Sequence, residues 1–182
     1  MSDIPDQVYR QLLVVRCQAG DPDAFAELIA LYQPRLHYFL RKMLPDAGRV
    51  EDLLQDVWLD VFRGVARLTR PAAFPAWLYR IARDRVYRSL RRREPPSCSL
   101  DGLDPADESA GEDEWSAEDA AEVHAALDQL SPDHREVLLL RFMEEMSYDD
   151  MARALGCPLG TVRSRLHHAK RALRGVFIRR LS

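Results

Sequence analysis

The sequence predicts an all-α protein, built from two small helical domains that a flexible acidic linker joins. Apolar residues recur at helical spacing through most of the 182 residues, and no long stretch alternates with the period of two that marks a strand. Residues 94–116 are rich in Pro, Gly, Ser and acidic residues, which is the composition of a linker. We therefore expect domains at 6–95 and 118–182, with the linker at 96–117.

The first two helices are expected before residue 45. The first runs roughly from Asp6 to Gln18. Asp21 is a suitable N-cap for the second helix, because Pro22 then occupies its first position. Pro34 lies inside the long pattern that follows and should kink or divide it.

The third helix contains the stretch "VEDLLQDVWLDVFR" and has an acidic polar side that includes Asp52, Gln55 and Asp56. Its apolar residues supply more surface than one buried stripe requires. Carboxylates are repelled by phosphates, so this side is not a DNA contact. It is either an ordinary solvated face or a docking surface for a basic protein partner.

The fourth helix follows a loop, ends near Arg93 and interleaves basic with aromatic side chains. Its expected buried seam is Leu78, Ile81, Ala82, Val86 and Leu90. Its opposite side is Arg80, Arg83, Asp84, Tyr87, Arg88 and Arg91, and Arg92 and Arg93 add charge at its end. Phe74, Trp77 and Tyr79 lie beside these charges, with Trp77 expected to be mostly buried. Compensation of the helix dipole explains part of the charge, but arginines beside rings also predict a surface for single-stranded nucleic acid.

The second domain should begin near Glu118 and end in a helix-turn-helix. Ser131 is placed to cap one helix, Ser147 to cap the next, and Gly156 to end it. The last helix combines a basic polar face with an apolar stripe at Val162, Leu166, Ala169 and Leu173. In this motif the N-terminal residues of the second helix contact base edges in the major groove.

Charge is distributed unevenly along the chain. The net charge is −3, yet residues 96–122 hold ten acidic and no basic side chains, which suggests a nucleic-acid binder with an acidic connector. Cys17, Cys98 and Cys157 have neither disulfide-framework nor zinc spacing, so we expect no metal or cofactor. No signal peptide or membrane-spanning run is present, and we expect a cytoplasmic protein.

Four stretches together resemble the extracytoplasmic-function class of bacterial RNA polymerase sigma factors. The resemblance covers about residues 8–95 and 118–175. Its motifs, in order, are "GDPDAFAELIALYQPRLHYFLRKML", "EDLLQDVWLDVFR", "FPAWLYRIARDRVYRSLRRR" and "LSPDHREVLLLRFMEEMSYDDMARALGCPLGTVRSRLHHAKRALR". Their order and spacing are far more specific than a single helix-turn-helix.

The resemblance implies a factor without catalytic residues that directs core RNA polymerase to promoters. The third helix would dock on the β′ clamp helices through Asp52, Gln55, Asp56 and Trp58. The −10 element would be opened and bound as a single strand by Phe74, Trp77, Arg80, Arg83, Asp84, Tyr87, Arg88, Arg91 and Arg92. The −35 duplex would be bound by Thr161, Arg163, Ser164, Arg165, His167, His168 and Arg171. Other implied partners are the β flap and an anti-sigma factor, often membrane-anchored, while the chain itself does not insert in a membrane.

Two positions depart from the usual pattern of this class. Asp84 stands where many relatives carry Asn or another uncharged polar residue, and a carboxylate can accept from cytosine N4. His167 and His168 replace the more usual Arg, so −35 affinity should strengthen as the pH falls toward about 6.

Two rival functions fit the sequence less well. An autonomous regulator of the LuxR-like kind would need a ligand or phosphoacceptor domain, and the first block has no parallel βα pattern. A metalloenzyme would need ligands at a known spacing, and none of the His, Cys and Asp spacings matches one.

Overall fold

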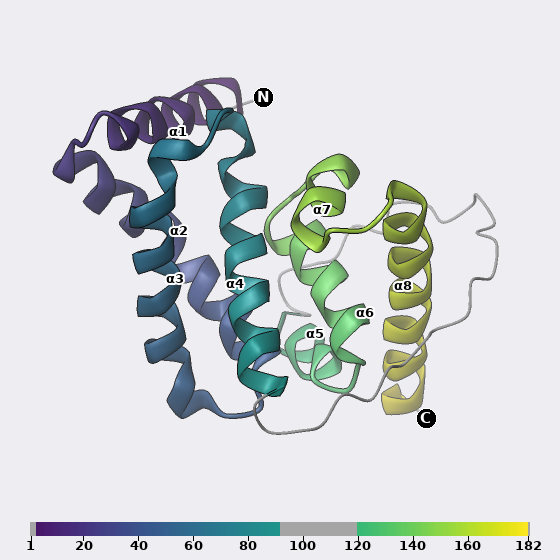
Figure 1. The fold of residues 1–182 in the computed structure, drawn as a ribbon. Coiled ribbons are helices and arrows are strands. Elements are labelled where there is room, and N and C mark those ends of the chain that lie inside the picture. Colours follow the sequence, from purple (N-terminus) through teal and green to yellow (C-terminus); the bar gives the residue numbers. More distant parts are fainter. Residues whose placement is uncertain (1–2, 92–119, 182) are drawn as a thin grey trace. The chain divides into compact units, whose positions relative to one another are not determined.

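The computed structural model describes residues 3–91 and 120–181, and every regular element within them is a helix (Figure 1). The chain splits into two compact units. The first contains α1 (Asp3–Gln18), α2 (Pro22–Met43), η1 (Ala47–Arg49), α3 (Val50–Gly64), η2 (Val65–Arg67), η3 (Pro71–Ala73) and α4 (Phe74–Arg91). The elements after it are α5 (Ala120–Leu127), α6 (Pro132–Leu138), η5 (Leu139–Met143), α7 (Tyr148–Leu155) and α8 (Leu159–Leu181).

The predicted all-α class with two helical domains is confirmed. The expected linker, residues 96–117, and the position Arg92 lie outside the described residues. The exact domain boundaries stay predictions.

The start of α2 is fixed by Asp21, as its sequence predicts. The Asp21 carboxylate accepts from the backbone N–H groups of Asp23 at 3.0 Å and Ala24 at 3.1 Å. The Arg16 side chain donates to it from α1 at 2.9 Å. The bond from Ala24 and then the contact with Arg16 lower the pKa of Asp21 from its usual value.

Pro34 does not divide α2, so that alternative of the sequence prediction is wrong. The helix continues through Pro34 to Met43. Pro34 lacks an N–H, and the carbonyl that loses its partner belongs to Ala30. Both residues are exposed, so water can satisfy that carbonyl while Leu36 and Leu40, each 0% exposed, hold the second half of the helix in the core.

The core of the first unit lies between α2, α3 and α4. Aromatic rings meet edge to face across it, with Phe39 5.2 Å from Tyr79 and Tyr32 5.3 Å from Phe74 between ring centroids. Gln18 joins α1 to this core, because its amide donates to the Leu68 carbonyl at 2.6 Å. The same amide donates to the Val65 carbonyl at 3.1 Å, so α1 holds the start of the segment that leads into α4.

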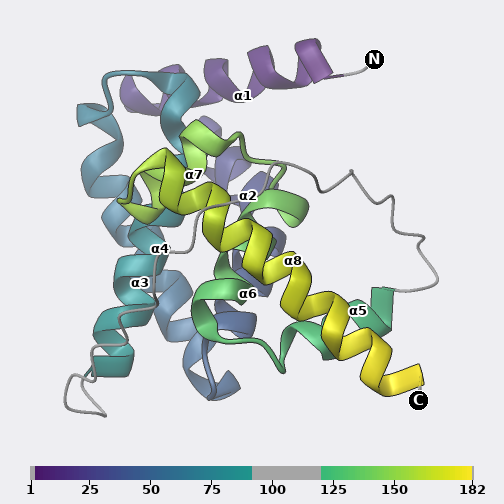
Figure 2. The same cartoon turned by 90° about the vertical axis from the view of Figure 1, so that its right-hand side faces the viewer.

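In the second unit α8 packs along α6 and reaches α5 (Figure 2). Ser131 accepts from the His134 N–H at 3.4 Å and caps α6, as predicted. Arg135 reaches back from α6 to three carbonyls at and just after the end of α5, which stabilises that turn. These bonds run to the carbonyls of Leu127 at 2.8 Å, Asp128 at 3.0 Å and Leu130 at 3.0 Å.

None of the helices in the described part of the chain has the length and apolar character needed to cross a membrane.

Candidate nucleic-acid and protein interfaces

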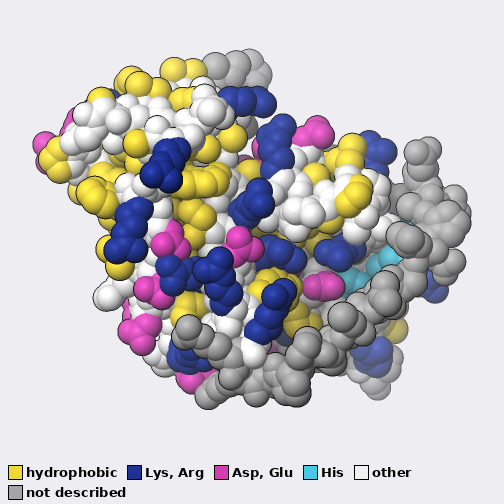
Figure 3. All heavy atoms as spheres, viewed as in Figure 1, with side chains coloured by type: hydrophobic (Ala, Val, Ile, Leu, Met, Phe, Trp, Pro, Cys, Tyr) yellow, Lys and Arg dark blue, Asp and Glu magenta, His cyan; other side chains and the backbone are white. Residues whose placement is uncertain are grey.

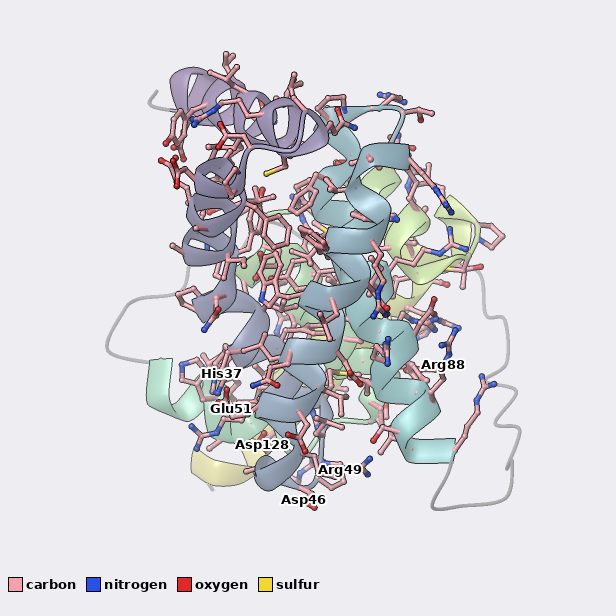
Figure 4. The ribbon with its side chains drawn as sticks, turned by 60° about the vertical axis from the view of Figure 1, so that its left-hand side comes forward. His37, Asp46, Arg49, Glu51, Arg88 and Asp128 are labelled. Carbon is pink, nitrogen blue, oxygen red and sulfur yellow. The ribbon has the colours of Figure 1, made fainter. Side chains whose placement is uncertain are left out.

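The helix α4 presents a basic side to solvent, as its spacing predicts. Arg80, Asp84, Arg88 and Arg91 are exposed. Lys and Arg side chains lie among carboxylates over α3 and α4 on the face seen in Figure 3. In Figure 4 Arg88 projects away from the body of α4. Such a helix can bind a phosphate backbone through several cations at once.

Arg83 and Tyr87, on the same side of α4, contact each other. The Arg83 guanidinium carbon lies 4.7 Å from the centroid of the Tyr87 ring, and both side chains are half-buried. A cation stacked on a ring is attracted to its π face. The pair therefore offers a flat, partly pre-organised surface beside the exposed arginines.

The buried side of α4 differs in part from the prediction. Leu78, Ala82 and Val86 are each 0% exposed, whereas Ile81 and Leu90 are half-buried. The ring of Tyr79 is also buried, as is Ser89.

The expectation that Phe74 contacts DNA is corrected by its burial. Its side chain is 1% exposed and packs against Tyr32 and Trp77, so its ring is not available to stack on a base. Trp77 is half-buried and lies close to Gly64 at the end of α3. Of the rings proposed for unpaired bases, Trp77 and Tyr87 remain partly accessible.

The acidic side of α3 is divided between solvent and ion pairs. Asp52 and Gln55 are exposed. Glu51 meets His37 of α2 at 3.0 Å, and the two side chains point toward one another in Figure 4. Asp56 is half-buried because Arg85 of α4 binds it at 3.0 Å.

Trp58 is not an exposed docking residue, and this part of the prediction is corrected. Its side chain is 7% exposed and meets the Phe25 ring edge to face at 6.2 Å. Leu59 and Phe62, which are not among the predicted docking residues, are exposed by 49% and 65%. They follow Gln55 at helical spacing on the side away from the buried seam, and that spacing is the signal that identifies them.

The helix-turn-helix forms as its local sequence predicts. Ser147 Oγ accepts from the Asp150 N–H at 3.1 Å and donates to the Asp150 carboxylate at 2.7 Å. Gly156 has φ +65° after the last residue of α7, and the Cys157 N–H then donates to the Ala152 carbonyl at 3.2 Å. This is the left-handed glycine cap that re-directs the chain into α8.

The two faces of α8 separate clearly. The predicted stripe of Val162, Leu166, Ala169 and Leu173 is buried, at 0%, 3%, 0% and 6% exposure. Arg163 and Arg171 are exposed, and Thr161, Ser164, Arg165, His167 and His168 are half-buried. All seven predicted −35 residues thus lie on one helix whose opposite side is anchored.

Local contacts limit what some of these side chains can do. Ser164 Oγ donates to the Thr161 carbonyl at 3.1 Å, one turn back along α8. The His167 and His168 rings meet edge to face with centroids 5.5 Å apart. Arg163 is therefore the exposed cation at the start of α8 best placed to make a new directional contact.

Comparison with known proteins places both units in one family. Residues 28–95 match the family model described as Sigma-70 region 2, and residues 115–173 match Sigma-70, region 4. The RNA polymerase sigma-H factor of Pseudomonas aeruginosa is 35% identical over 175 residues, covering 90% of this chain and 91% of that protein. The ECF RNA polymerase sigma-E factor of Escherichia coli K12 is 32% identical over 180 residues, covering 92% and 94%.

Two solved structures have the same fold. The sigma factor RpoE from Bartonella quintana, in complex with the anti-sigma factor NepR, aligns with a TM-score of 0.65 and 26% identity over 84% of this chain and 96% of that chain. CnrH in complex with the cytosolic domain of CnrY aligns with a TM-score of 0.67 and 23% identity over 92% and 96%.

Proposed function

The chain belongs to the extracytoplasmic-function family of RNA polymerase sigma factors and acts in promoter-specific initiation of transcription, and we propose how its two units divide that task. The second unit binds the −35 duplex, the first unit opens and holds the −10 strand, and α3 docks the factor on core polymerase. The chain itself carries no catalytic site in this proposal, since the chemistry belongs to the polymerase.

The observation that carries this proposal is the exposed start of α8 on a buried support. Arg163 projects from the first turns of a helix whose apolar stripe is anchored, so it can enter a groove without disturbing the unit. A bidentate arginine contact to guanine is the commonest specific contact in the major groove. Arg171 lies about 12 Å further along α8 and suits a phosphate.

On α4 the proposed −10 surface consists of exposed charges beside partly accessible rings. Arg80, Arg88 and Arg91 neutralise the displaced strand, and Arg92 extends this row in the sequence. Trp77 and Tyr87 are the remaining rings for unpaired bases. Phe74 instead supports the surface from the core.

On α3 the proposed docking face combines Asp52, Gln55 and Asp56 with Leu59 and Phe62. Exposed apolar side chains next to carboxylates suit a partner helix that has both apolar and basic residues. The β′ clamp helices of core polymerase are the partner that we infer for this face.

Further partners follow from the family. We infer contact between the second unit and the β flap, and control by an anti-sigma factor of the kind found with the Bartonella quintana factor. A factor that works with RNA polymerase on chromosomal promoters acts in the cytoplasm. The LuxR-like alternative is not favoured, because relatives match both units along 90% of the chain.

The proposal is tested by run-off transcription with purified core RNA polymerase and a library of promoter fragments. The full chain should direct specific transcripts, and Leu59→Asp should reduce their yield about tenfold or more, as expected for loss of an interface hot spot. Leu12→Asp is the matched control, because Leu12 is exposed by 53% on α1, outside the proposed face. No specific transcript from the wild-type chain would overturn the proposal.

A further inference from the structure

Arg85 bridges α4 to α3, although it belongs to none of the surfaces described above. Its Nε donates to Oδ2 of Asp60 at 2.7 Å, and its second terminal nitrogen lies 2.6 Å from the same oxygen. Its other terminal nitrogen donates to Oδ2 of Asp56 at 3.0 Å. One guanidinium on α4 therefore binds two carboxylates that are one turn apart on α3.

The carboxylates that Arg85 binds belong to a row of negative charges along α3. Asp52, Asp56 and Asp60 follow one another at a spacing of four, and like charges at this spacing repel each other on a helix. Arg85 neutralises the second and third members. Asp56 still has 48% of its side chain exposed, against 32% for Asp60, so Asp56 is the bridged carboxylate that a partner can reach.

The geometry leaves Asp56 able to bind a second cation. The Arg85 bond uses Oδ2, and an ionised carboxylate has further lone pairs on its other oxygen. The planar guanidinium binds in a fixed direction, which a lysine ammonium does not. We propose that Arg85 is a positioning residue for the docking face of α3, holding Asp56 in the orientation in which core polymerase binds it. This inference rests on the proposed function of α3.

Packing of α3 on α4 does not depend on the bridge. Val57 and Val61 of α3 and Ala82 and Val86 of α4 are each 0% exposed. An ion pair that is partly exposed adds little to stability. Removal of Arg85 should therefore change polymerase binding more than folding.

The test measures the affinity of the full chain for purified core RNA polymerase by fluorescence anisotropy, with Tm as the readout of stability. Arg85→Gln should weaken binding roughly five- to tenfold, the size of coupling seen between contacting residues, while Tm changes little. Arg85→Lys should restore part of the affinity, because it keeps the charge without the fork.

Arg16→Gln is the matched control. Arg16 joins α1 to α2 in a similar way, with its nitrogens 2.8 Å from Asp21 and 4.0 Å from Glu27, and it lies outside the docking face. This variant should keep the wild-type affinity for core polymerase. An equal loss of affinity in Arg16→Gln and Arg85→Gln would overturn the positioning role, because the effect would then follow any lost ion pair.

A double-mutant cycle separates positioning from direct contact. If Arg85 acts through Asp56, the pair Asp56→Asn and Arg85→Gln should bind within about twofold of Asp56→Asn alone. Additive losses, or an Arg85→Gln variant with unchanged affinity, would contradict the proposal.

Phe62→Asp distinguishes a wrong role for Arg85 from a wrong assignment of the docking face to α3. If Phe62→Asp loses affinity and Arg85→Gln does not, α3 still docks and only the role of Arg85 is wrong. If Phe62→Asp and Leu59→Asp both keep full affinity, the docking face assigned to α3 is wrong.

Discussion

At Gly64 a single hydrogen atom decides how closely α3 can approach the Trp77 side chain. A Cβ at this position would lie 2.8 Å from Cζ2 and 3.1 Å from Cη2 of the Trp77 ring. The ring is rigid and half-buried, so Gly64→Ala should destabilise the first unit by about 1–3 kcal/mol through overpacking. Urea denaturation followed by tryptophan fluorescence measures this change.

Gly175→Ala is the control for that substitution. Gly175 lies inside α8, and a Cβ there meets nothing within 4 Å. Alanine should therefore stabilise the helix by about 0.5–1 kcal/mol. If both variants are stabilised alike, the Trp77 ring moves freely and the close approach at Gly64 carries no constraint.

Asp21 makes the stability of the first unit depend on pH. Its pKa is lowered in the folded state, chiefly by the Ala24 N–H and then by Arg16. A depressed carboxyl pKa contributes stability above the unfolded value and loses it as the pH falls through the folded value. The Tm difference between wild type and Asp21→Asn should therefore favour wild type near neutral pH and shrink below the usual pKa of 3.8. A difference that stays constant into acid would contradict this assignment.

At the scale of elements, the features that local chemistry controls could be predicted. The caps at Asp21, Ser131 and Ser147 and the glycine end at Gly156 each depend on residues within one turn of the chain. The apolar stripe of α8 is similarly local, because its members share one face of one helix. These helix ends and the buried stripe could therefore be predicted from the local sequence alone.

The errors concern contacts between elements. Trp58 and Leu59 are neighbours in sequence, yet Phe25 of α2 covers the first and leaves the second exposed. Phe74 starts the helix that was expected to bind unpaired bases, but Tyr32 of α2 covers its ring. Sequence spacing gives the faces of a helix, whereas the neighbour that covers each face depends on tertiary packing.

Variants of α8, the helix proposed to bind the −35 element, should separate effects on sequence specificity from effects on overall affinity. Arg163→Ala should cost on the order of 1–3 kcal/mol on the preferred −35 sequence and relax the preference at one base pair. Arg171→Ala should weaken binding by a similar factor on every sequence, because phosphate contacts carry no base information. Affinities of the holoenzyme for a set of single-base −35 variants measure both effects. Equal losses on all sequences for both variants would show that Arg163 is not a reader.

At the scale of the whole molecule, the flexible linker predicted at residues 96–117 would limit how the chain binds promoter DNA without polymerase. As the random coil that its composition predicts, a linker of roughly 23 residues would have a root-mean-square span of about 26 Å and an extended limit near 80 Å. Promoter elements two helical turns apart are separated by roughly 70 Å. If the linker rarely spans this distance, binding of one unit to its promoter element hardly raises the effective concentration of the other unit at the second element.

The free chain should therefore bind a duplex that carries both promoter elements no more than about threefold more tightly than a duplex that carries the −35 element alone. Core polymerase should remove this limit. When polymerase has already fixed the distance between the two units, the conformational entropy of the linker is not lost again when DNA binds. Gel-shift titrations with and without purified core polymerase, at one fixed salt concentration, compare the two cases. Tight binding by the free chain that needs both elements would mean that residues 96–117 hold the units apart by themselves, and the role assigned to polymerase would have to be abandoned.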